Sequence, residues 1–588
     1  MSRRAIVILV AGCALLALVV NAGTLAHLGQ TDAYGDWDQH LFYADVATRA
    51  VLHDHQLPLW NPFPCGGIPL LAHPESRVLT PFFALHLLLG AARAIPIEIV
   101  LHSLIAALGM ALLARSVKAS VAGALVAATI FAGSSFVPLH LGVGHLWVLP
   151  VAWAPLCLWL DARAGERPIL AAAAGVVLAL MIGEGGIYIA PHVGLLLCAA
   201  TAWRAIRARS PRPVAGLLIT FATAFLLAAP KLIPLLDLLS HRPRHVDSHE
   251  WISLVDLWKS LTARGQNLGV PNSEHFPWAW HEIGHYVGLP ALALAAIGAL
   301  RDRRRSLAWL AMLVVFTMLA LGDFAPWSPW ALLHRLPLLG SQHVPTRFLA
   351  LAVLAIALLA ARGATSLLER APPRARSIAG AALVLLVGID VVSASAGLIG
   401  APRCPLRPWP DDAPRSTTLL TLRRAPGGAY CRPSPRSAMA RAPSAGVALL
   451  DATEQMCPRT GGGYLGRDPG IVGADEAGYR GEAWIAEGEG RVMITHRTQN
   501  SIALTVETRG PARVVLAQNA DAGWRVRGGR LVDDSDGRLA LVVDGPGAVD
   551  LSYVPPHALA ALAGPLVAVL GIAWLWRRDR RRRARIPI

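Results

Sequence analysis

The sequence predicts a polytopic α-helical membrane protein of about twelve spans, each near the roughly 20 residues that cross a bilayer. A C-terminal extracytoplasmic β-sandwich-like domain and a final transmembrane helix are expected to follow. The 588 residues are 54% hydrophobic, with a mean hydropathy of +0.47, whereas soluble domains are about 45–50% apolar. The apolar residues form long blocks rather than short stripes. Basic residues gather in the connections between these blocks.

The first apolar block, 5–20, follows Arg3 and Arg4. It is longer than the roughly 7–15 apolar residues of a signal peptide, so we expect an uncleaved first span. Positively charged connections stay in the cytoplasm. With about twelve spans, both termini and every basic connection fall on the cytoplasmic side, as in a bacterial inner-membrane protein; these connections are 115–118, 163–167, 204–212, 301–305, 362–376 and 577–585. The net charge of +16 is spread over them, which argues against nucleic-acid binding.

The long connections fall on the opposite, extracytoplasmic side, where loops commonly carry function. They are 28–93, 240–285, 323–345 and 403–556. Within the first of them, the apolar segment 78–92 contains Pro81 and His86 and is short for a span, so we expect an interfacial or re-entrant helix. The patterns divide the chain into a multi-span module, 1–399, with its first outward loop at 28–93, a mostly β domain, 400–556, and a last membrane helix with a basic tail, 557–588.

The β domain is predicted from short apolar runs that are separated by glycine-rich turns. The runs are 492–494, 502–506, 514–516, 539–543 and 549–551, and the segment 558–576 forms the last span. Because this domain faces an oxidising compartment, one disulfide is expected, with one thiol left over. The spacing does not select the pair among Cys404, Cys431 and Cys457.

The densest group of residues with chemical potential lies in the first outward loop, at 32–40. Asp38 is suited to cap the N-terminus of the helix that follows. Asp36 then lies just ahead of that helix, free to point into a cavity beside the membrane. A second interpretation stays open, in which these carboxylates are solvated loop residues and one of them is a helix cap.

The stretch Gly35-Asp36-Trp37-Asp38-Gln39, followed by Leu57-Pro58-Leu59-Trp60-Asn61-Pro62 and Gly66-Gly67-Ile68-Pro69, resembles the YfhO family of bacterial membrane proteins. That family belongs with the GT-C glycosyltransferases. Weaker similarities extend over most of the chain, at 144–155, 229–234, 345–348, 522–524 and 553–555. The resemblance implies that the multi-span module is GT-C-like.

The resemblance also implies an enzyme that moves a sugar from a polyprenyl-phosphate-linked donor to an extracytoplasmic glycan or lipid acceptor. GT-C enzymes use such donors and keep an acidic residue in the first outward loop. The acceptor hydroxyl must lose a proton as it attacks the anomeric carbon, and a carboxylate can take it. We therefore predict Asp36 as the general base, with Asp38 as the second catalytic candidate and a candidate metal ligand. Whether a divalent metal takes part is left open.

The leaving lipid phosphate needs positive charge nearby, and the candidates are Arg347 and Lys231, each near an outward span end. The alternative for Arg347 is a helix-end anchor. The alternative for Lys231 is an interfacial position or a pair with Asp237. The predicted cavity is lined by Gln39, His145, Glu184 and Glu282. For His145 and Glu184, satisfied structural contacts are the competing interpretation.

Two other classes of function compete with the transferase. The first is a non-catalytic transporter or assembly factor for cell-envelope glycolipids, which would need the same cavity but not Asp36. The second is a zinc metalloprotease, since His281-Glu282-Ile283-Gly284-His285 matches H-E-x-x-H, a pattern that presents two imidazoles on one face of a helix. Gly284 weakens such a helix, and no further ligand follows before Asp302, so the protease ranks third.

Overall fold

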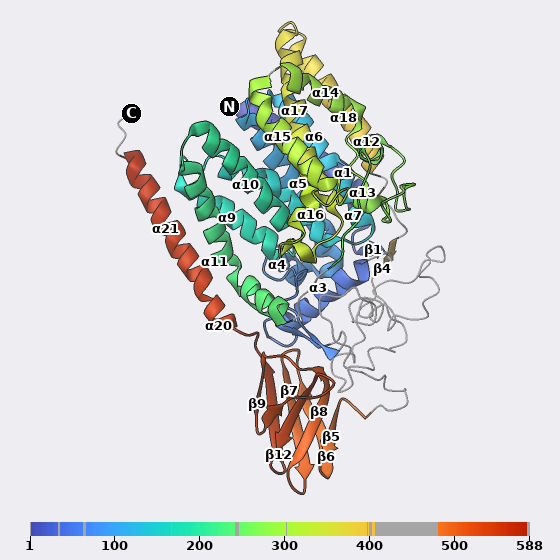
Figure 1. The fold of residues 1–588 in the computed structure, drawn as a ribbon, viewed down its shortest axis with the longest axis vertical. Coiled ribbons are helices and arrows are strands. Elements are labelled where there is room, and N and C mark those ends of the chain that lie inside the picture. The colour runs from blue at the N-terminus through green and yellow to red at the C-terminus, as the bar shows by residue number, and fades with distance from the viewer. Residues whose placement is uncertain are drawn as a thin grey trace.

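Figure 1 shows the computed structural model, which describes residues 2–32, 36–62, 66–165, 167–241, 246–301, 303–396, 398, 403–405 and 480–584. A helical body forms most of the molecule, and a β domain is attached at one end of it. The predicted disulfide residues Cys431 and Cys457 lie outside the described residues, as do the side chains of Asp38, Gln39 and Cys404.

Nine helical segments of the described chain are long and apolar enough to cross a membrane. They are α1 (Arg3–Val20), α5 (Ala91–Ser116), α6 (Val121–Gly133) with α7 (Phe136–Gly142), α10 (Ile189–Ala208), α11 (Arg212–His241), α13 (Trp280–Ile283) with α14 (Gly288–Arg301), η4 (Pro345–Phe348) with α17 (Leu349–Arg370), α18 (Arg376–Ser395) and α20 (Ala558–Ala561) with α21 (Ala563–Ala584). The chain is therefore a multi-pass membrane protein.

Three further apolar segments are shorter or begin with several arginines. They are η2 (Leu146–Trp153) with α8 (Ala154–Asp161), α9 (Pro168–Gly183) and α15 (Arg303–Ala320). If all three cross the bilayer, the described chain reaches the total of about twelve spans that the apolar blocks predict. That total stays a prediction.

The remaining elements are short and connect the long helices. They are α2 (Ala22–Leu25), α3 (Trp37–Leu52), α4 (Phe83–Leu89), α12 (Leu254–Thr262), α16 (Pro329–Leu333), η3 (Leu339–Ser341), and two small antiparallel sheets, β1 (Gln30–Asp32) with β4 (Arg403–Pro405) and β2 (Trp60–Asn61) with β3 (Ile68–Pro69). Helix α4 has seven residues, too few for a span. The apolar segment 78–92 thus forms no separate membrane-length helix, as predicted.

Helix α17 forms the centre of the helical body. Nearly all of its side chains are buried, and it packs against α6, α14 and α15. An apolar surface on every side is typical of a helix that is surrounded by others. Gly363 of α17 and Gly298 of α14 allow these two helices to cross closely, because a Cβ on either glycine would collide with a backbone carbonyl of the other helix.

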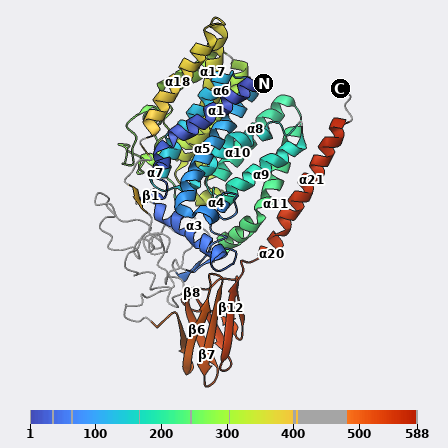
Figure 2. The ribbon, with the colours of Figure 1, turned by 180° about the vertical axis from the view of Figure 1, so that it is seen from behind.

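The two chain ends lie at the same end of the helical body, and the β domain lies at the opposite end, as Figures 1 and 2 show. The connection between α17 and α18, which carries Arg370 and Arg376, lies at the end that holds the chain termini. That this end faces the cytoplasm stays a prediction from the basic connections. Helix α21 leaves the β domain and runs back along the outside of the body, against α9 and α11.

The β domain consists of two four-stranded antiparallel sheets, ordered β10-β11-β8-β5 and β6-β7-β12-β9. Along β7, Ile502, Leu504 and Val506 are buried while the residues between them are half-buried, the alternation of a strand with one face on a core. The core takes residues from both sheets. The eight strands are β5 (Ala483–Glu487), β6 (Gly490–Arg497), β7 (Ser501–Thr508), β8 (Ala512–Asn519), β9 (Trp524–Arg527), β10 (Arg530–Val532), β11 (Arg538–Val543) and β12 (Gly547–Tyr553). The five predicted runs fall in β6, β7, β8, β11 and β12.

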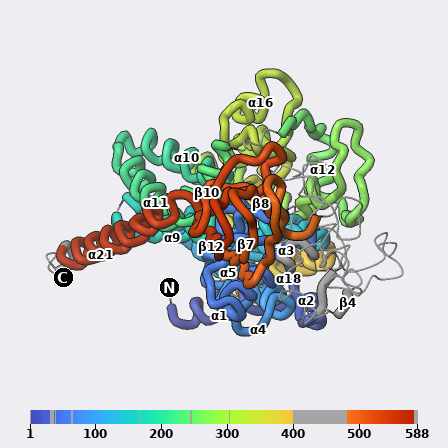
Figure 3. The backbone as a smooth tube through the Cα atoms, turned by 90° about the horizontal axis from the view of Figure 1, so that it is seen from below, coloured from blue at the N-terminus to red at the C-terminus, as the bar shows by residue number. Residues whose placement is uncertain are grey.

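The second half of the first outward loop packs against the β domain and connects it to the helical body. Trp60 is buried in the core of the β domain, with its ring centroid 5.3 Å from that of Trp524 and 4.6 Å from that of Tyr553. Its Nε1–H donates to Gln518 Oε1 at 3.0 Å. From the β domain, Gln499 Nε2 donates to the Val46 carbonyl of α3 at 2.7 Å, and Figure 3 shows the strands lying over that helix.

Candidate functional site

Asp36 lies at the N-cap position of α3, and its side chain makes no capping hydrogen bond. Asp38 falls inside the first turn of α3, so the prediction that Asp38 caps the helix is wrong by two residues. A tertiary contact explains the earlier start, because the backbone N–H of Asp36 donates to the Val143 carbonyl at 2.7 Å. Gly144, with φ +83°, allows this approach, since a Cβ there would collide with the backbone of Trp37.

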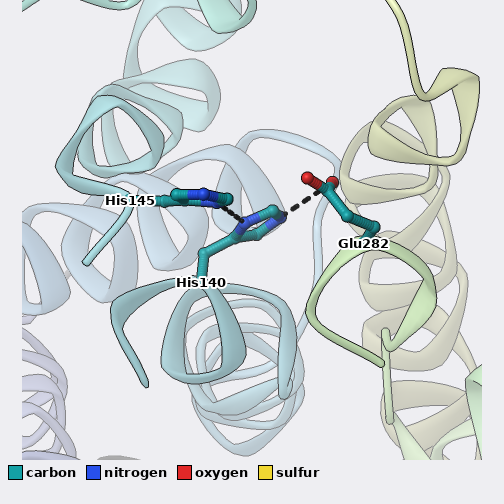
Figure 4. Close-up of side chains that lie close together, drawn as sticks. All are labelled: His140, His145 and Glu282. Carbon is teal, nitrogen blue, oxygen red and sulfur yellow. Dashed lines mark hydrogen bonds and ion pairs between the residues drawn. The ribbon is translucent and has the colours of Figure 1, made fainter. Parts of the chain in front are cut away.

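The Asp36 carboxylate begins a row of polar side chains that leads into the helical body. Its Oδ2 is 3.3 Å from His145 Nε2. The Nδ1 atoms of His145 and His140 are 2.9 Å apart, so one imidazole donates to the other. Beyond them, His140 Nε2 is 3.9 Å from Glu282 Oε2. Figure 4 shows the two imidazoles and the Glu282 carboxylate in this order. The row joins α3, α7 and α13.

Glu282 ends the row in a buried ion pair with Arg347. The guanidinium donates to both carboxylate oxygens, from Nε to Oε2 at 2.8 Å and from Nη2 to Oε1. Both side chains are 3% exposed. The guanidinium carbon also lies 4.4 Å from the Trp147 ring centroid and 4.2 Å from that of Tyr188, distances at which cations are attracted to aromatic faces. Arg347 is thus held by an internal carboxylate and two rings.

The electrostatic surroundings keep Asp36 ionised. Burial raises the pKa of its carboxyl, but the hydrogen bond from His145 and the charges of His145, His40 and His281 outweigh burial and bring the pKa below the ordinary value of 3.8. The neighbouring His40 is buried, and this burial lowers its pKa to about 3. At neutral pH, therefore, Asp36 is an anion beside a neutral His40.

Glu184 belongs to a second polar cluster, in which Glu184 and His102 are buried while Trp153 and Thr80 are half-buried. Its Oε2 is 2.9 Å from His102 Nε2, and Trp153 Nε1–H donates to both oxygens at 3.1 and 3.2 Å. Thr80 Oγ1 donates to Oε1 at 3.5 Å. The side chain of Glu184 has no exposed surface. These contacts are the satisfied structural arrangement that competes with a cavity-lining role for Glu184.

Lys231 lies in the same region as Glu184 and is 1% exposed. Its Nζ donates to the carbonyl of Ser76 in the first outward loop. Asp237 instead lies near His241 and His557, with Oδ1 3.8 and 3.9 Å from their ring nitrogens. The structure therefore holds Lys231 and Arg347 on different internal partners.

The H-E-x-x-H sequence does not form the helix that a zinc protease needs. Helix α13 has four residues and ends at Ile283, after which Gly284 is extended. His281 joins the Asp36 cluster, where its ring centroid is 5.2 Å from that of His145. His285 turns away, stacks on Phe136 at 4.6 Å and places Nδ1 3.1 Å from the Ile283 carbonyl. The two imidazoles thus have different surroundings.

Among the described residues, His140, His145 and Glu282 form a group whose candidate metal-ligand atoms all lie within 4.8 Å of one another. Imidazole and carboxylate donors together suit zinc and several transition metals. Both oxygens of Glu282 are already bound by Arg347. A metal ion at this position would have to compete with Arg347 for Glu282, and the group fits a hydrogen-bonded row better than a preformed metal site.

Of the residues singled out from the sequence, Asp36, His145 and Glu282 come together, with Arg347 behind them. Sequence reasoning missed His140, Trp147 and Tyr188, which complete the row and enclose the guanidinium. A signal for His140 exists, because an ionisable residue inside an otherwise apolar helix calls for a reason. The two aromatic residues carry no such signal, since membrane helices commonly place them near their ends.

No family model matches the chain, and no curated protein matches it in a sequence search. Among solved structures, it is similar to the mycobacterial arabinofuranosyltransferase AftD, at 19% identity over 76% of this chain and 32% of that chain, with a TM-score of 0.47. A structure of an AftD mutant gives 18% identity, coverage of 73% and 31%, and a TM-score of 0.45.

The archaeal oligosaccharyltransferase AglB from Archaeoglobus fulgidus, in complex with an inhibitory peptide and a dolichol-phosphate, is also similar. It shows 14% identity over 68% of this chain and 55% of that chain, with a TM-score of 0.38. The chain thus spans about a third of the length of AftD. Because all three TM-scores lie below 0.5, we base the proposed function on the residues of the site.

Proposed function

We propose that the chain is a membrane glycosyltransferase that moves a sugar from a polyprenyl-phosphate-linked donor to an extracytoplasmic glycan or lipid acceptor. The proposal places the protein in a bacterial inner membrane, with both termini in the cytoplasm and the β domain outside. The observation that carries it is the state of Asp36, a carboxylate that is one third exposed and is oriented by His145. A reaction centre needs such a group, open to substrate on one side and held on the other.

In this proposal, one oxygen of the Asp36 carboxylate is held by the protein and the other accepts the proton. Oδ2 faces His145 Nε2, whereas no described residue hydrogen-bonds Oδ1. In the proposed step, the acceptor hydroxyl oxygen bonds to the anomeric carbon as the bond between that carbon and the phosphate oxygen breaks. The bonding electrons leave with the lipid phosphate, the hydroxyl proton passes to Asp36 Oδ1, and the configuration inverts. His145 acts as a positioning residue, because both its ring nitrogens face protein partners.

Arg347 and Lys231 remain the proposed groups for the donor phosphate. Both are buried cations, which are costly inside a membrane and are commonly retained for function. Each has an internal partner, Glu282 for Arg347 and the Ser76 carbonyl for Lys231. Phosphate binding therefore requires an exchange of partner. Asp38 and Gln39 follow Asp36 on the first turn of α3 and stay the next candidates for catalysis and for lining the site.

The test is sugar transfer in proteoliposomes that contain the full chain and labelled polyprenyl-phosphate sugars. Asp36→Asn keeps the size of the side chain and removes its basicity, so transfer should fall by about 10²–10⁴-fold. Asp323→Asn is the matched control, because Asp323 Oδ2 also faces a histidine, His249 Nδ1, at 2.8 Å in an outward loop. Full activity of Asp36→Asn would reject this base. Glycolipid movement without transfer by the wild type would favour the transporter.

A further inference from the structure

A cavity of about 650 Å³ lies at the junction between the helical body and the β domain. One wall is the end of α11, with Asp237 and His241, and a second is the first outward loop at Pro69 and Ala72. The third wall belongs to the β domain, from segments that include Asp521 and Asp533. A junction between two folded parts is a common position for a ligand site, and the volume is within the roughly 300–1,000 Å³ of typical ligand pockets.

The charges that line the cavity disfavour an anionic ligand. Three aspartates, Asp237, Asp521 and Asp533, line the cavity together with one arginine, Arg530, and one histidine, His241. A lipid phosphate would meet net repulsion there. Hydroxyl groups, in contrast, donate hydrogen bonds to carboxylates, and such charge-assisted bonds are the stronger class. The rest of the lining includes several proline residues, which add apolar surface that suits the apolar faces of sugar rings.

The cavity is distinct from the Asp36 cluster. Ala72, in the cavity wall, precedes His73, whose Nε2 is 3.4 Å from the Tyr43 hydroxyl of α3. Asp36 and Tyr43 are seven residues apart along that helix, a rise of about 10 Å. A glycan bound in the cavity therefore reaches Asp36 only if further sugar units extend along the loop.

We propose that this cavity is a remote subsite for a neutral oligosaccharide, the part of the acceptor glycan that does not react. The proposal rests on the function proposed above and names its acceptor class. Binding energy from a remote part of a substrate can serve to hold the reacting part in place. Long acceptors should therefore have a lower KM than short ones, and pocket variants should raise the KM for long acceptors without changing transfer to short ones.

The test is oligosaccharide binding to the full chain in lipid nanodiscs, measured by saturation-transfer NMR. The probes are neutral gluco-, manno-, galacto- and arabino-oligosaccharides of one to six residues, with inorganic phosphate as the anionic probe. At least one hexamer should bind, and Asp237→Asn with Asp533→Asn should weaken it by about tenfold, the scale of lost hydrogen bonds to charged groups. Asp550→Asn, an exposed residue of β12 outside the cavity lining, is the matched control.

Ala72→Trp gives a second variant, which fills the cavity and should abolish hexamer binding. Binding should persist in Asp36→Asn, since that residue lies outside the cavity. The inference is overturned if no oligosaccharide binds, if the pocket variants bind as the wild type does, or if phosphate displaces the hexamer. Hexamer binding in a protein that shows no sugar transfer would reject the proposed enzyme and leave the glycan site standing. Transfer that is lost in Asp36→Asn but does not depend on acceptor length would support the proposed enzyme and reject the glycan site.

Discussion

The polar clusters around Asp36 and around Glu184 contain the same kinds of residue but differ in how fully their carboxylates are bound. The side chain of Asp36 is 33% exposed, and only one of its oxygens faces a described partner. Glu184 is fully buried, and both of its oxygens accept hydrogen bonds from His102, Trp153 or Thr80. A fully bound carboxylate holds helices together, whereas one with a free oxygen at the surface can take a proton.

The largest expected effect is on the rate of sugar transfer, which should depend on the Asp36 cluster and not on the Glu184 cluster. Asp36→Asn should lower transfer by about 10²–10⁴-fold, because the amide cannot accept the acceptor proton. Glu184→Gln should leave the rate per folded molecule unchanged, since both oxygens of Glu184 are bound by protein side chains. Both variants are compared as kcat in proteoliposomes after correction for the folded fraction. Equal losses of kcat in the two variants would mean that the exposure of the carboxylate does not tell a catalytic cluster from a structural one.

The next effect concerns the buried pair behind Asp36. Glu282→Gln leaves the Arg347 guanidinium without its counter-charge, which should destabilise the protein by about 3–5 kcal/mol. Thermal unfolding in detergent measures the loss. The double variant Glu282→Gln with Arg347→Met removes both charges and should recover most of the stability. If the double variant is no more stable than Glu282→Gln alone, the pair does not act as a compensated unit.

A pH effect of intermediate size links the two clusters, because His40 faces Asp36, Arg77 and His145, and His73 faces Lys231 and His40. Burial lowers the pKa of both imidazoles from 6.5 to about 3. Between these values the unfolded chain binds protons that the folded chain does not, so stability falls as the pH drops below 6.5.

The loss is at most about 1.4 kcal/mol per pH unit for each histidine. The Tm measured from pH 7 to pH 5 should therefore decrease. Replacement of His73 by Gln should make that decrease shallower, and replacement of the exposed His249 should not. A Tm that rises on acidification would contradict the neutral, buried state of these imidazoles.

The smallest effect tests the structural role of Glu184 directly. Glu184→Gln keeps the shape of the side chain but weakens its charge-assisted contacts with His102 and Trp153, at a cost of about 1–3 kcal/mol in the free energy of unfolding. The loss in the free energy of unfolding is measured by denaturation in mild detergent. Glu75→Gln, at a more exposed neighbouring residue, is the control. A stability equal to that of the wild type would show that the contacts of Glu184 contribute nothing net.

Several features of the fold and site follow from local patterns in the sequence. Apolar blocks near the length of a span predict the membrane helices, and five alternating runs predict strands that the structure contains. Asp36 was recognisable from the acidic first loop, and Glu282 from the H-E-x-x-H pattern. His145 was recognisable as a polar residue near the end of an apolar segment. These features depend on a period or a length along the chain, so a single stretch is enough to detect them.

The tertiary structure alone decided which of these residues meet. Asp36 reaches His145 because Gly144 admits the start of α3, whereas Glu184 turns to His102 and Lys231 to Ser76. Trp60, part of the motif on which the family resemblance rests, fills the core of a domain more than 400 residues away along the chain. The sequence by itself determined the apolar helices, the strands and the polar candidates, because hydrophobic periodicity is local. The groupings are decided by packing between distant segments, which no local pattern encodes.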